Sequence, residues 1–98
     1  SENMQSIAIS TENLPNFLQE NPQVLLLDVR TADEHHDKNL GGAFIPLAEL
    51  PMRLNELNPL EPILIYCQSG QRSQRAVTLL RKSGFPRVYH LANGIDSL

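Results

Sequence analysis

Cys67 is the only cysteine of the chain, and it directly follows the apolar run Ile63–Tyr66. Residues 68–73 are polar or small, with Gly70 in the middle and Arg72 near the end. A strand that ends here and a helix that begins just after it would leave free backbone N–H groups beside the sulfur. Such donors, together with the helix dipole and nearby arginines, favour the thiolate, which is the nucleophilic form of cysteine.

The polar sequence after Cys67 decides between two interpretations of this residue. A lone cysteine is more often a small buried apolar side chain than a nucleophile. Residues 68–73 are too polar to pack in a core, and reactive cysteines typically lie in electropositive, partly exposed places. We therefore predict that Cys67 is a partly exposed nucleophile, and that Gly70 lets backbone N–H groups curve around an anion.

The spacing between Cys67 and Arg72 indicates which kind of group the loop holds. Four residues separate them, and the next arginine, Arg75, comes too late to replace Arg72. A cysteine-dependent phosphatase loop has one residue more at this point, which lets it close around a tetrahedral phosphate. The shorter loop encloses a smaller space, better matched to a single additional sulfur atom on the cysteine. The spacing therefore favours sulfur chemistry over phosphate chemistry.

Four segments together resemble the rhodanese (thiosulfate sulfurtransferase) family in its single-domain form. Residues 67–73 match the family's active-site pattern C-x-S-G-x-R-S, and residues 26–30 with Glu34 resemble its "LDVR…E" segment. Residues 42–47 resemble its "GA…IPL" segment with one residue missing, and residues 91–96 resemble its closing "L-x-G-G-x" segment. The resemblance covers nearly the whole chain. Three departures, at Asn39, Asn93 and Leu98, lie outside the active-site loop.

The resemblance implies two-step sulfur transfer through a persulfide on Cys67. The donor is a small sulfur-containing anion such as thiosulfate, and the acceptor is cyanide in an assay or a thiol, free or on a protein, in a cell. Neither a metal nor an organic cofactor is implied. The catalytic residues are predicted to be Cys67 and Arg72. Substrate binding is assigned to Gln68, Ser69, Gly70, Gln71 and Ser73, and a supporting role to Asp28, Arg30 and Arg75.

Two other functions remain open at this point. The first is a persulfide carrier or regulatory binding module, which would act on a particular protein partner with little thiosulfate activity. The same loop would serve that role, so the loop alone does not separate the two. The second is a phosphatase or arsenate-type oxyanion enzyme on the same fold, against which the short loop argues.

The order of apolar segments predicts an α/β domain, and the resemblance implies a single rhodanese-like domain over residues 1–98. We expect a mostly parallel central sheet of about five short strands with helices on both faces. Strands are predicted at residues 7–9, 24–29, 63–66 and 87–90. Helices are predicted at residues 14–20, 47–57 and 71–82, where apolar side chains recur at helical spacing.

Asp28 and Arg30 stand where the predicted strand 24–29 ends. In parallel α/β sheets, ligands bind outside the carboxyl ends of the strands, where Cys67 is also expected. The two residues are therefore predicted to brace the active loop, or to form a local pair that ties down their own loop. Arg30 could also attract anions.

Residues 33–37 (Asp-Glu-His-His-Asp) raise the question of a metal site. Adjacent histidines point in different directions on a helix and share no face, so they make a poor ligand pair. We predict a solvated acidic turn instead. Glu34 matches a position of the rhodanese family that is expected to order the local loop.

The composition is that of a small globular domain. The chain has 98 residues, of which 41% are hydrophobic, and a net charge of −3, so no basic surface argues for nucleic acid. A single cysteine forms no internal disulfide, which favours a reducing, cytoplasmic location. No apolar stretch approaches membrane-spanning length, so no membrane partner is expected.

Overall fold

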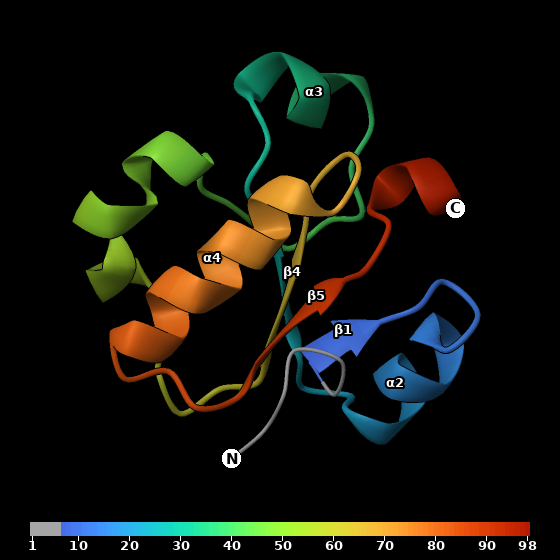
Figure 1. The fold of residues 1–98 in the computed structure, drawn as a ribbon, viewed down its shortest axis with the longest axis horizontal. Helices are drawn as coiled ribbons and strands as arrows, with labels where there is room; N and C mark the ends of the chain where they lie inside the picture. Colours follow the sequence, from blue (N-terminus) through green and yellow to red (C-terminus); the bar gives the residue numbers. More distant parts are fainter. Residues whose placement is uncertain (1–6) are drawn as a thin grey trace.

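A sheet of five parallel strands, in the order β1-β5-β4-β2-β3, lies at the centre of the computed structural model, which describes residues 7–98 (Figure 1). The strands are β1 (Ala8–Ile9), β2 (Leu25–Asp28), β3 (Ala43–Phe44), β4 (Ile63–Tyr66) and β5 (Val88–Leu91). The α-helices are α2 (Leu14–Glu20), α3 (Ala32–Asp37) and α4 (Gln71–Lys82), and short 3-10 helices are η1 (Leu47–Met52), η2 (Leu54–Glu56) and η3 (Ile95–Ser97). The predicted α/β class with a parallel sheet is confirmed.

Helices cover both faces of the sheet, as predicted. Helix α4 lies with the 3-10 helices η1 and η2 on one face, and α2 lies on the other (Figure 1). The larger part of the core gathers under α4, where Ile65 meets Val77 and Leu80. On the opposite face, Phe17 of α2 packs with Leu64.

The central strand β4 sets the position of the cysteine. It pairs with β2 on one side and β5 on the other, and all four of its residues are buried. Because side chains alternate along a strand, Ile65 and Cys67 face α4, whereas Tyr66 faces the other side. Asp28, the last residue of β2, is in register with Tyr66. The carboxyl ends of β2 and β4 therefore coincide, and they bring Asp28 and Cys67 to the same edge of the sheet.

The prediction of one helix over residues 47–57 is wrong. The structure has two 3-10 helices there, η1 and η2, separated at Arg53. Pro51 lies inside η1, and its missing N–H and its ring disfavour an α-helix through this position. The apolar spacing nevertheless indicated side chains of the core, because Leu50 and Leu57 are both buried.

The segment after β2 is also different from its prediction. Residues 32–37 form helix α3 and not a solvated turn. Thr31 begins this helix with a capping box, in which its hydroxyl accepts the N–H of Glu34 while the Glu34 carboxylate accepts the N–H of Thr31. The strand β3 has no counterpart among the predicted segments, since two residues are too few to show a strand periodicity.

Candidate active site

Cys67 lies in the turn between β4 and α4, where the sequence placed it. Its exposed fraction is 0%, so the prediction of a partly exposed thiol is wrong. The reason is that Cys67 continues the inward-facing positions of β4 and joins the core under α4. A substrate reaches the sulfur only after the side chains or the backbone of the loop move.

The Cys67 sulfur is surrounded by dipoles of its own loop. The backbone N–H of Gly70 donates to Sγ at 3.1 Å and that of Ser73 at 3.3 Å. The Ser73 hydroxyl lies 3.5 Å from Sγ and donates to the Gly70 carbonyl at 3.0 Å. Two of the residues predicted to bind substrate, Gly70 and Ser73, thus contact the sulfur itself. This arrangement stabilises negative charge on sulfur without a cation in direct contact.

Two glycines let the loop and the C-terminal segment approach closely. Gly70 has φ +104°, and a Cβ there would lie 2.0 Å from the carbonyl oxygen of Ala92. Gly94 has φ +68°, and a Cβ there would lie 2.3 Å from the carbonyl oxygen of Gln68. The N–H of Ile95 also donates to the Cys67 carbonyl at 2.9 Å. Residues 92–95 therefore pack directly against the backbone of the active loop. Asn93, which departs from the family pattern, is exposed.

Asp28 and Arg30 form a buried ion pair at the end of β2. Arg30 donates to Asp28 from its backbone N–H and from its Nε and Nη2 atoms, at 2.9–3.0 Å. His35 Nδ1 donates to the same carboxylate at 2.8 Å, and its ring stacks on Phe44. Burial alone would raise the pKa of Asp28, but the hydrogen bonds from Arg30 and His35 outweigh it and lower that pKa. Asp28 is therefore ionised at neutral pH.

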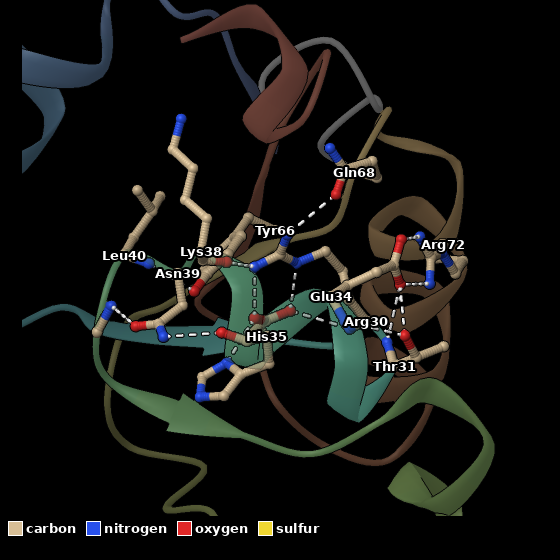
Figure 2. Close-up of polar contacts among 12 residues, drawn as sticks. Arg30, Thr31, Glu34, His35, Lys38, Asn39, Leu40, Tyr66, Gln68 and Arg72 are labelled. Carbon is tan, nitrogen blue, oxygen red and sulfur yellow. Dashed lines mark hydrogen bonds and ion pairs between the residues drawn. The ribbon is translucent and has the colours of Figure 1, made fainter.

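Arg30 connects this pair to the active loop. Its guanidinium, which binds Asp28, also donates from Nη1 to Gln68 Oε1 at 2.9 Å (Figure 2). Gln68 in turn donates from Nε2 to Asp96 at 2.5 Å. Arg30 also donates to the Lys38 carbonyl. Asp28 and Arg30 form the predicted local pair. Arg30 also makes the predicted contact with the active loop, through Gln68.

Residues 38–40, which include the departure at Asn39, are held by hydrogen bonds to Arg30, His35 and Tyr66. The Tyr66 hydroxyl accepts the N–H of Leu40 at 2.9 Å, and Asn39 donates to the His35 carbonyl at 2.9 Å (Figure 2). Asn39 Oδ1 also accepts the N–H of Gly41. The departure at Asn39 thus closes the turn after α3 by its own hydrogen bonds.

Arg72 is bound by Glu34 of α3. Its two Nη atoms donate to the two carboxylate oxygens of Glu34 at 2.7 and 2.9 Å (Figure 2). This bidentate contact, with the capping bonds of Thr31, lowers the pKa of Glu34 to about 2, and it raises the pKa of Arg72. Arg72 therefore anchors the end of the loop to α3, and its predicted catalytic role stays a prediction.

Arg75 lies one turn further along α4 and is exposed. With Arg72 and Arg30 it lines an open groove of about 340 Å³, together with the apolar side chains of Val29, Pro46, Leu47 and Ala48, and with Thr31. Within residues 7–98, Arg75 makes no ion pair. Ser69 and Gln71 are exposed on the outside of the loop, where they contribute no contact to Sγ in the described structure.

Several contacts of this site were not predicted from the sequence. Gly94 packs against the Gln68 carbonyl, and Asp96 accepts a hydrogen bond from the Gln68 side chain. Glu34 binds Arg72, and Ser73 is hydrogen-bonded to the buried His90. The Thr31–Glu34 spacing of a capping box was a signal for α3. His90 carried no such signal, since a histidine in a strand has no motif of its own.

Neither a metal site nor a membrane span is seen in the part of the chain that the structure describes. No group of three or more His, Cys, Asp or Glu side chains there could hold a metal ion. No helix there is long and apolar enough to cross a bilayer.

Known proteins are similar to this chain over most of its length. YrkF of Bacillus subtilis, named as a candidate sulfur carrier protein, is 37% identical over 97 residues; the match covers 97% of this chain and 52% of YrkF, so the chain spans about half the length of that relative. A protein of Allochromatium vinosum named sulfurtransferase is 35% identical over 88 residues, covering 89% of this chain and 82% of the relative.

The fold and the family model lead to the same assignment. The crystal structure of a rhodanese-like domain protein from Staphylococcus aureus superposes with a TM-score of 0.82 at 32% identity, covering 92% of this chain and 88% of that one. The model of the rhodanese-like domain matches residues 10–98. The chain therefore belongs to the family of rhodanese-like domains.

Proposed function

We propose that this protein is a sulfurtransferase that carries the transferred sulfur as a persulfide on Cys67. The single observation that carries the proposal is the environment of Sγ, which accepts backbone N–H groups from Gly70 and Ser73. Such donors stabilise a thiolate, and backbone N–H groups of the same loop can also stabilise negative charge on the outer sulfur of a persulfide.

The proposed reaction has two steps. In the first, the Cys67 thiolate attacks the outer sulfur of thiosulfate; the S–S bond of the donor breaks, sulfite leaves with the bonding electron pair, and a Cys67 persulfide remains. In the second, an acceptor thiolate attacks the outer sulfur of the persulfide, and Cys67 departs as a thiolate. With cyanide as the acceptor, the product is thiocyanate. Neither step requires an added oxidant or reductant.

The groove beside the loop supports the choice of a small anionic donor. Arg75 has no carboxylate partner among the described residues, so its charge is available to an approaching anion. Arg72 and Arg30 are held by Glu34 and Asp28, and we assign them to the shape of the loop. In this proposal Arg75 attracts the donor to a groove that the loop borders at Arg72.

A second candidate is a persulfide carrier that serves one protein partner. Two observations favour it: the exposed fraction of Cys67 is 0%, and YrkF is named as a candidate sulfur carrier. In that case a partner would open the loop on docking, and thiosulfate alone would load the protein slowly.

Intact mass spectrometry tests the proposal. The purified protein and its Cys67→Ala variant are incubated with thiosulfate, and cyanide is added last. The proposal predicts a gain of one sulfur, about 32 Da, that appears only with Cys67 and is removed by cyanide. No gain on wild type, with a thiol that still reacts with iodoacetamide, would refute thiosulfate as donor and favour the carrier.

A further inference from the structure

His90 is a buried ionisable side chain that the proposed reaction does not use. It lies in β5, its exposed fraction is 5%, and its Nδ1 is 3.2 Å from the Ser73 hydroxyl. Ser73 is in turn hydrogen-bonded to the Cys67 sulfur through its backbone N–H and lies 3.5 Å from it through its hydroxyl. A buried chain of three side chains therefore runs from the sulfur to His90.

The face of the sheet separates His90 from the buried pair of Asp28 and Arg30. His90 is in register with Ile65, on the side of α4, whereas Asp28 is in register with Tyr66, on the opposite side. The other buried polar or charged side chains of the described residues are Asp28, Arg30 and Ser73, and only Ser73 hydrogen-bonds His90. The side chains of α4 that accompany Ser73 inward, Ala76 and Val77, are apolar. His90 thus faces the hydroxyl in an uncharged environment.

Burial of His90 disfavours a proton relay from the thiol. Burial lowers the pKa of His90, and a hydrogen bond to the backbone of Leu91 offsets only part of this effect. A proton passed from Cys67 through Ser73 would create two buried charges, an imidazolium and a thiolate, which is costly. What remains for His90 is its choice of tautomer, that is, which ring nitrogen carries the hydrogen.

The hydrogen count at Ser73 favours one tautomer when the hydroxyl donates to Gly70. The hydroxyl has one hydrogen, and the Gly70 carbonyl accepts it at 3.0 Å. With the hydroxyl hydrogen on Gly70, a hydrogen bond with His90 needs a hydrogen on Nδ1, which is donated to Ser73 Oγ. The thiol can donate to the remaining lone pair of the same oxygen. Once the thiol proton has been lost to water, the hydroxyl can turn from Gly70 to donate to the thiolate.

We propose that His90 is a positioning residue for the nucleophile: its Nδ1–H, donated to Ser73 Oγ, keeps the hydroxyl hydrogen available for the Cys67 sulfur. The opposite tautomer would present a bare Nδ1, which would compete with the sulfur for that hydrogen. His90 touches neither donor nor acceptor and acts only through Ser73. This inference deepens the proposed function, and it rests on Cys67 being the nucleophile.

The experiment compares alkylation of Cys67 by iodoacetamide as a function of pH in five proteins. They are the wild type, His90→Leu, His90→Asn, Ser73→Ala and the double variant Ser73→Ala/His90→Leu. The pH profile of alkylation reports the thiolate, while its rate also depends on access to the buried sulfur. Alkylation needs no sulfur donor, so its outcome is independent of whether thiosulfate is the substrate. The thiosulfate loading experiment, read by intact mass, can therefore fail while the alkylation experiment still tests the role of His90.

His90→Leu is expected to slow alkylation at pH 7 by about fivefold, the worth of one neutral hydrogen bond, and to move the midpoint of the pH profile upward. His90→Asn, which retains an N–H at a similar position, is expected to recover most of that loss. In the Ser73→Ala background, His90→Leu is expected to add no further loss. Equal rates for His90→Leu and wild type, equal losses for the Leu and Asn variants, or the same loss with and without Ser73 would each overturn the proposal.

A measurement on the unaltered protein covers the case in which His90→Leu does not fold. The ¹⁵N chemical shifts of the His90 ring at pH 7 distinguish a protonated Nδ1 from a bare one. The proposal requires the Nδ1–H tautomer. A hydrogen on Nε2 alone would overturn it.

Discussion

The two halves of the active loop are stabilised by opposite means. The outer half is held by full charges: Arg30 binds Gln68, and Glu34 binds Arg72. The inner half, around the Cys67 sulfur, is held by backbone N–H groups and the neutral hydroxyl of Ser73.

This difference follows from the environment of each half. Arg72 and Glu34 retain about a third of their exposure, so their charges are still partly hydrated. The sulfur is fully buried, and a charged partner there would have to be desolvated as well. The comparison suggests that ion pairs set the shape of the loop, while neutral dipoles handle the charge that the reaction creates on sulfur.

The largest effect on the charged half is expected from Asp28→Asn. This change leaves the guanidinium of Arg30, which is 2% exposed, without its carboxylate. Breaking a buried pair from one side costs about 3 kcal/mol or more in free energy of unfolding. Urea unfolding measures it, with Glu61→Gln, an exposed carboxylate of the loop before β4, as the control that should stay within about 0.5 kcal/mol of wild type. A loss no greater than that of the control would show that the pair does not hold the end of β2.

Glu34→Gln is expected to have a smaller and pH-dependent effect. A glutamine Oε1 can preserve the capping box with Thr31, so the change removes the charge and one of the two hydrogen bonds from Arg72. Since the partners are partly exposed, we expect a loss of about 1 kcal/mol at pH 7.

The sign of the pH dependence follows from the lowered pKa of Glu34. That pKa is about 2 in the folded protein and 4.5 in a free side chain, so the stabilisation is present above pH 4.5 and is lost as the pH falls toward 2. Wild type should therefore lose stability faster than Glu34→Gln across this window, as thermal unfolding at stepwise lower pH would show. Parallel curves for the two proteins would contradict a charge-dependent anchor.

Arg75→Ala is expected to give the smallest effect. It removes a charge that makes no ion pair within residues 7–98, so the fold should be unaffected. The KM for thiosulfate should rise about threefold at low salt, with kcat nearly constant, and the difference should vanish at high salt because free charges are screened. Lys82→Ala, at the far end of α4, is the matched control. An effect on kcat that persists at high salt would show that Arg75 acts in the sulfur-transfer step and not in attracting the donor.

The inner half of the site was easier to predict from the sequence than the outer half. The position of Cys67 before α4, and the limits of α4 and β4, follow from local periodicity and from Gly70, and the structure agrees with them. The burial of Cys67 depends on how α4 packs on the sheet, which no local pattern contains. The contacts from Glu34 to Arg72 and from Ser73 to His90 join residues far apart in the chain, so the sequence alone could not reveal them.

The regions that were predicted wrongly have a common cause. In residues 47–57, apolar spacing indicated a helix, but Pro51 imposed 3-10 geometry. In residues 32–37, the polar composition suggested a turn, but the capping bonds between Thr31 and Glu34 stabilise a helix. In both segments the conformation is decided by hydrogen bonds of individual residues, which composition and periodicity do not register.

The most direct test of the account is the crystal structure of the protein after treatment with thiosulfate. The account predicts a second sulfur bonded to Cys67 Sγ, within hydrogen-bonding distance of backbone N–H groups of residues 68–73, with the pair between Glu34 and Arg72 intact. A second sulfur that instead contacts the guanidinium of Arg72, released from Glu34, would contradict the division between a charged frame and a neutral sulfur site.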